Sequence, residues 1–145
     1  MFVLIVGAGR VGSAVAKKAL AAGHEVSILD EDPLSHERLD TDLDGSWEDQ
    51  GGLFTVGTAL EIEALEEAGI DRAEVFIAST DGDNTNIVIS QIAQRRFNVP
   101  RVLARVLDPA RAAWYAEQDL QTISPTQQAI SMFEEAAFSG AEDDQ

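Results

Sequence analysis

Short apolar runs alternate with segments of helical periodicity along most of the chain. The apolar runs predict six strands, at residues 2–6, 25–29, 53–56, 74–78, 101–106 and 120–123. Most of the segments between them repeat apolar residues at three- and four-residue spacing, as amphipathic helices do. This alternation favours βαβ units and a mostly parallel sheet covered by helices.

Local signals predict where several helices begin and end. A helix over residues 10–22 should end at Gly23, which can adopt the left-handed conformation of a helix C-cap. Thr58 and Glu61 have the spacing of a capping box, which predicts a helix that starts there and ends at Gly69.

Two later helices are predicted by proline at the first helical position, in Asp108-Pro109 and Ser124-Pro125. Periodicity also predicts which side chains face the core in two of the helices. For the first helix they are Val11, Val15, Ala16, Ala19 and Leu20, and for the helix after the turn at 79–84 they are Val88, Ile89, Ile92 and Ala93.

The least regular part of the chain is residues 33–51, where we expect a short helix and a solvated acidic loop. His36 lies there, and neither it nor His24 has a metal-ligating partner at ligand spacing, so we predict no metal site. We expect one domain over residues 1–138, followed by a flexible acidic tail over residues 139–145.

Composition narrows the classes of protein that the chain can be. Its 145 residues suit one domain with a real core, and 45% of them are hydrophobic, as in ordinary globular proteins. No apolar run approaches the roughly 20 residues that a membrane-spanning helix needs. There is no cysteine, which favours a cytosolic protein. The net charge of −16 argues against a nucleic-acid partner, because such binding depends on basic surfaces.

A glycine motif at the end of the first predicted strand carries the strongest functional signal. Gly7, Gly9 and Gly12 form G-x-G-x-x-G between a strand and a helix, the context in which this motif binds dinucleotides. The helix N-terminus would hold the phosphates. Asp30, at the end of the second strand, would accept hydrogen bonds from ribose hydroxyls and repel a 2′-phosphate. The motif therefore predicts a nucleotide site.

The predicted order of elements places further residues at this site. Six strands with helical crossovers imply a doubly wound, Rossmann-like α/β fold with strand order 3-2-1-4-5-6. Ligands then bind beyond the carboxyl ends of the first and fourth strands, so Thr80 and Asp81 should face the ligand or cap the next helix. Arg10 and Arg105 are candidates for phosphate contacts, with solvent exposure and a surface salt bridge as their alternatives.

The sequence favours binding without catalysis. A dehydrogenase on this scaffold needs an acid or base beside its substrate, and no lysine, histidine or cysteine is predicted near the switch point. A small NAD-dependent oxidoreductase, or the cofactor domain of one, stays open as the alternative.

Several motifs occur together along residues 1–130. They are G-x-G-R-x-G at residues 7–12, D-x-D-P at 30–33, G-T at 57–58, L-x-x-A-G-I at 65–70, A-x-T-D-x-D-x-x-N at 78–86, A-R-x-x-D-P at 104–109 and I-S-P-T at 123–126. In this combination they resemble one family, the N-terminal domain of Trk/Ktr potassium-uptake regulators, also called the RCK or KTN domain.

The resemblance implies a cytoplasmic regulatory subunit that binds NAD(H) or ATP/ADP. Such domains form homodimers or larger rings and gate a membrane-embedded potassium channel or transporter from the inner face of the membrane. By position, the implied nucleotide contacts are Gly7, Ala8, Gly9, Arg10, Val11, Gly12, Asp30, Glu31, Thr80, Asp81 and Arg105. The chain departs from the family at Thr58, where an acidic residue is usual, and we identify no second ligand-binding domain, which many members carry.

Overall fold

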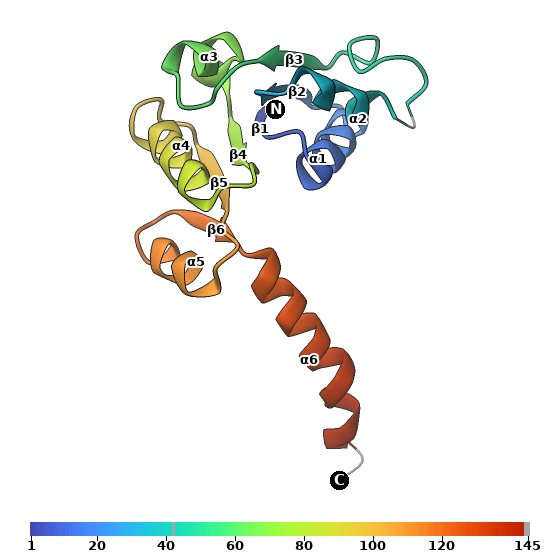
Figure 1. Cartoon of the computed structure of the whole chain (residues 1–145), viewed down its shortest axis with the longest axis vertical. Coiled ribbons are helices and arrows are strands. Elements are labelled where there is room, and N and C mark those ends of the chain that lie inside the picture. Colours follow the sequence, from blue (N-terminus) through green and yellow to red (C-terminus); the bar gives the residue numbers. More distant parts are fainter. Residues whose placement is uncertain (42, 144–145) are drawn as a thin grey trace.

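A single parallel sheet organises the computed structural model, which describes residues 1–41 and 43–143. Its strands lie in the order β3-β2-β1-β4-β5-β6 (Figure 1). Their bounds are β1 Phe2–Val6, β2 Glu25–Asp30, β3 Leu53–Val56, β4 Val75–Ala78, β5 Arg101–Arg105 and β6 Gln121–Ile123. The predicted fold class and strand order are confirmed.

Within the described residues, helices connect these strands, and one further helix follows the last strand. Their bounds are α1 Arg10–Ala21, α2 His36–Asp40, α3 Ile62–Glu67, α4 Asp83–Arg95, α5 Pro109–Ala116 and α6 Pro125–Asp143, with short 3₁₀ turns η1 Pro33–Ser35 and η2 Ile70–Arg72. None of them is long and apolar enough to cross a bilayer.

Alternate residues of β1 build two separate cores, because successive side chains of a strand point to opposite faces. Leu4 and Val6 pack into a large cluster with residues of α3, α4 and α5. Val3 and Ile5 pack into a smaller cluster with residues of α1, α2 and the loop that follows α2. The second face is covered mainly over β1 to β3, so Ile77 on β4 is only partly buried there.

The first helix packs on the sheet with small residues rather than with its large apolar ones. Gly12, Ser13 and Ala16 are its buried residues, whereas the side chains of Val11 and Val15 are 54% and 37% exposed. The prediction that these two valines face the core is wrong, because the helix lies too close to β1 to fit them.

Two other helix predictions differ from the structure. The helix predicted from Thr58 begins at Ile62, since residues 58–61 form a turn in which the Glu61 N–H donates to the Thr58 carbonyl. In α4, Val88 is 43% exposed, and Ile87 and Ser90 are buried instead.

The last helix extends away from the sheet (Figure 1). It continues through Ser139, where we expected a flexible tail to begin, and ends at Asp143. Its exposed apolar side chains include Met132, Phe133 and Phe138, of which Phe133 is 76% exposed.

The two tryptophans have opposite surroundings. Trp47 is fully buried in the loop between α2 and β3, where its indole N–H donates to the Leu53 carbonyl. Trp114 on α5 is 55% exposed.

Candidate functional site

The glycine loop between β1 and α1 has the close contacts that the motif predicts. Gly7 has a φ of +102°, and a Cβ there would lie 2.7 Å from the Ser79 carbonyl oxygen. A Cβ on Gly12 would lie 1.9 Å from the Gly7 carbonyl oxygen. A Cβ on Gly9 would meet no atom within 4 Å. Gly7 and Gly12 are therefore required by the fold, whereas Gly9 leaves space open beside the loop.

The N-terminus of α1 is suited to an anion. Gly9 is its N-cap, no side-chain oxygen of the described residues caps it, and no acidic residue lies in its first turn. Unpaired N–H groups and the positive end of the helix dipole favour a phosphate at such a position.

Asp30 lies at the end of β2 and bonds to the backbone around the loop. Its Oδ2 accepts from the Ala8 N–H at 2.7 Å. Its Oδ1 accepts from the Asp32 N–H at 2.8 Å and from the Ser35 hydroxyl at 3.2 Å. Because each carboxylate oxygen can accept more than one hydrogen bond, Asp30 keeps capacity for ribose hydroxyls.

The turn after β4 is fixed by the fully buried side chain of Asn86. Its Oδ1 accepts from the N–H and hydroxyl of Thr80 at 3.0 and 2.6 Å, and its Nδ2 donates to the carbonyls of Thr80 and Arg105 at 3.0 and 2.9 Å. These bonds hold the β4–α4 turn against the carboxyl end of β5. Neither Asp81 nor Asp83 caps α4.

Arg105 also belongs to this turn. Its guanidinium donates to the Thr80 carbonyl at 2.9 Å and lies 3.7 Å from an Asp81 carboxylate oxygen. Its Nε is buried without a partner among the described residues.

These elements surround a cleft of about 450 Å³ at the carboxyl ends of β1, β2 and β4. Of the predicted contacts, those that line it are Gly7, Gly9, Asp30, Glu31, Thr80 and Asp81. Those that do not line it are Ala8, Arg10, Val11, Gly12 and Arg105. The cleft lies where strand order reverses, the place at which open α/β sheets bind ligands.

Sequence reasoning missed several polar residues of the cleft, among them Ser35 and Arg38. Both lie in the segment 33–40, which the sequence describes only as a short helix without indicating which side faces the ligand. The Asp-x-Asp-Pro motif at residues 30–33 indicates the turn that brings these two residues to the cleft. In that turn the Asp32 carboxylate caps η1 by accepting from the Leu34 N–H at 2.9 Å.

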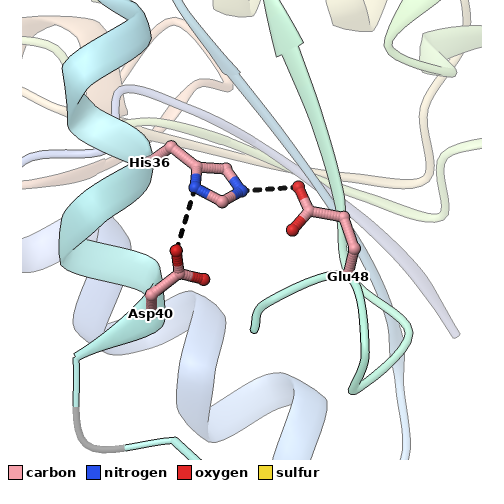
Figure 2. A group of neighbouring side chains, drawn as sticks. All are labelled: His36, Asp40 and Glu48. Carbon is pink, nitrogen blue, oxygen red and sulfur yellow. Dashed lines mark hydrogen bonds and ion pairs between the residues drawn. The ribbon is translucent and has the colours of Figure 1, made fainter. Parts of the chain in front are cut away.

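A second cluster lies outside the cleft, on α2 and the loop after it. Figure 2 shows His36 between two carboxylates, with its Nδ1 3.1 Å from Asp40 and its Nε2 2.5 Å from Glu48. We expected no such partners for His36, and that expectation is wrong. The carboxylates meet opposite ring nitrogens, so the cluster ties α2 to the loop that follows it.

Comparison of the sequence with those of known proteins identifies its family. The sequence model of the TrkA-N domain matches residues 3–125. A relative in Streptomyces coelicolor, named Trk system potassium uptake protein TrkA, is 37% identical over 143 residues, which are 98% of this chain and 61% of the relative. A Trk system potassium uptake protein TrkA homolog of Methanothermobacter thermautotrophicus is 31% identical over 135 residues, which are 92% of this chain and 59% of the relative. The chain thus spans about three fifths of these curated relatives.

Solved structures agree on the fold. The TrkA-N domain of the inner membrane protein ybaL from Escherichia coli superposes with a TM-score of 0.79 at 20% identity and covers 94% of this chain and 96% of that one. The Kef C-terminal domain of Shewanella denitrificans in an AMP-bound form superposes with a TM-score of 0.73 at 25% identity, over 94% of this chain and 79% of that one.

Proposed function

The chain belongs to the TrkA-N domain family, and from that membership we propose that it is the nucleotide-sensing part of a regulatory subunit of a potassium uptake system. The observation that carries the proposal is the cleft itself. It joins a glycine loop, an uncapped helix N-terminus and Asp30 at the switch point of the sheet.

The ligand that we propose is an adenine nucleotide, NAD(H) or ATP/ADP. Backbone N–H groups at the start of α1 would hold its phosphates, and Asp30 would accept from its ribose hydroxyls. The AMP in the related Kef domain supports this class of ligand. The titratable groups that line the cleft are carboxylates and one arginine, which suits binding better than proton transfer, so we propose a subunit without catalysis.

We further propose that the subunit works as a homodimer or larger ring. Exposed apolar side chains occur on α6, at Met132 and Phe133, and on the open face of the sheet, at Ile123. Large exposed apolar patches usually mark interfaces, and a second copy would supply both surfaces at once.

Regulation would then follow from differential binding. A nucleotide can bias a pore only if it binds one arrangement of the ring more tightly than another. In this proposal the subunit is cytoplasmic and lies against the inner face of the membrane through its transporter partner.

Two measurements test the proposed function. The melting temperature of the protein should rise when NAD, NADH, ATP or ADP is added, since a ligand at 100 times its Kd stabilises the folded state by about 2.7 kcal/mol. Potassium flux into vesicles that carry the transporter should then respond to the same nucleotide. A protein that no adenine nucleotide stabilises, or that turns over NADH with small carbonyl substrates, contradicts the proposal.

A further inference from the structure

Arg38 is the one basic side chain among the described residues that line the cleft, and four carboxylates line it as well. It comes from α2, the helix that follows the Asp30 turn. Its Nη1 donates to the Ala8 carbonyl at 3.2 Å. Within residues 1–41 and 43–143, no carboxylate forms an ion pair with it.

The guanidinium of Arg38 has donors to spare. Arginine carries five N–H donors in a planar fork, and the described residues accept from one of them. The chain has 26 acidic and 10 basic residues, and Arg38 is exposed beside acidic side chains of the cleft without an ion pair among the described residues. The fork fits a phosphate, which it can bind through two parallel hydrogen bonds.

The position of Arg38 indicates which part of a nucleotide it meets. It bonds the carbonyl of Ala8, between the two glycines of the loop that line the cleft. Asp30 bonds the N–H of the same residue. The two side chains therefore hold Ala8 from both sides, with the carboxylate placed for ribose hydroxyls and the guanidinium beside the start of α1.

We propose that Arg38 binds the 5′-phosphate groups of the nucleotide and sets the selectivity of the cleft for phosphorylated ligands. The inference rests on the proposed function, because it needs an adenine nucleotide in this cleft. It gives to Arg38 the role that the sequence suggests for Arg10 and Arg105. Arg10 is exposed and does not line the cleft, and Arg105 is engaged by the Thr80 turn.

A purely structural role for Arg38 makes a different prediction. If the guanidinium only supports the Ala8 carbonyl, its loss disturbs the loop for every ligand alike. If it binds phosphate, its loss weakens only the ligands that carry one. Adenosine and ADP therefore separate the two roles.

The experiment compares Arg38→Gln, Arg38→Lys and the matched control Arg95→Gln, an exposed change on α4 outside the cleft, with the unmutated protein, after circular dichroism has shown equal folding. Calorimetry measures the Kd of adenosine, AMP, ADP, NAD and NADP. We expect Arg38→Gln to weaken ADP and NAD about tenfold or more and adenosine less than about twofold, because charge-assisted bonds to phosphate are lost. Arg38→Lys should recover part of the loss, and Arg95→Gln should change each Kd less than about twofold.

Each other outcome overturns the inference in a recognisable way. Equal losses for adenosine and ADP assign Arg38 to loop support alone. A loss confined to NADP assigns it to a 2′-phosphate instead. If no ligand binds the unmutated protein, the proposed function fails as well, whereas tight binding that Arg38→Gln leaves unchanged overturns this inference alone.

Discussion

The backbone of Gly12 lies against that of Gly7, so closely that a Cβ on Gly12 would be 1.9 Å from the Gly7 carbonyl oxygen. This contact brings α1 down onto the end of β1. The helix can approach so far because its neighbouring buried residues, Ser13 and Ala16, are also small. The distance between helix and strand is thus set by residues that have almost no side chain.

Replacing glycines of this loop should therefore have two distinct effects. Gly12→Ala should destabilise the protein, toward the upper end of the roughly 1–3 kcal/mol that overpacking costs, because the obstructing atom is backbone. Gly9→Ala should leave the unfolding midpoint in urea nearly unchanged and weaken nucleotide binding, because its Cβ would enter open space beside the loop. Equal midpoints for the two variants would contradict this account.

Removal of the Asp30 carboxylate should weaken the binding of ligands with free ribose hydroxyls. Charge-assisted hydrogen bonds contribute roughly 1.5–3 kcal/mol each, and about 1.4 kcal/mol is a factor of ten in Kd. We expect Asp30→Ala to raise the Kd for NAD or ADP about tenfold or more in calorimetry. Glu66→Ala, an exposed change on α3 outside the cleft, serves as the control. Equal affinity of the unmutated protein for NAD and NADP would refute a selective role for Asp30.

The amide of Asn86 should matter to stability as well as to the site. Asn86→Ala removes four hydrogen bonds and leaves the Thr80 N–H and the Arg105 carbonyl without this partner. Buried polar groups left unpaired cost about 1–3 kcal/mol each, so a clear drop in the free energy of unfolding is expected. Asn84→Ala, two residues earlier on the exposed side of α4, loses only an exposed hydrogen bond from Arg111 and should cost less than Asn86→Ala. Urea titration of both variants checks the difference.

Charge on the last helix should break the proposed oligomer. Phe133 is 76% exposed, and Phe133→Asp places a carboxylate in the surface that we assign to a second copy. Light scattering should show a smaller particle than the unmutated protein. Ser131→Asp adds the same charge on another side of α6 and should leave the mass unchanged. A monomeric unmutated protein at high concentration would contradict the assignment.

The predictions that held from sequence alone were local ones. The strand before Gly7, the glycine spacing and the acid at Asp30 are adjacent in sequence or one βα unit apart, so their relation follows from the chain itself. The β4–α4 turn at Thr80 was placed at the cleft by strand order. These features together predict the fold and about a third of the residues that line the cleft.

The predictions that failed depended on distances between elements. The outward position of Val11 follows from the closeness of α1 to β1, which the apolar pattern of the helix does not record. Arg38 was missed because the orientation of α2 depends on the burial of Leu39 and Trp47. One partner of His36, Glu48, comes from a loop whose course the sequence left open.

The opposite burial of Trp47 and Trp114 makes the chain its own optical reporter. Indole emission shifts to shorter wavelength when the ring leaves water, so the two residues emit in different bands. Emission from Trp47 changes when the loop beside β3 unfolds. Emission from Trp114 changes when another molecule binds over α5. With Trp114→Phe the remaining band isolates folding, and its subtraction from the spectrum of the unmutated protein isolates the emission of Trp114.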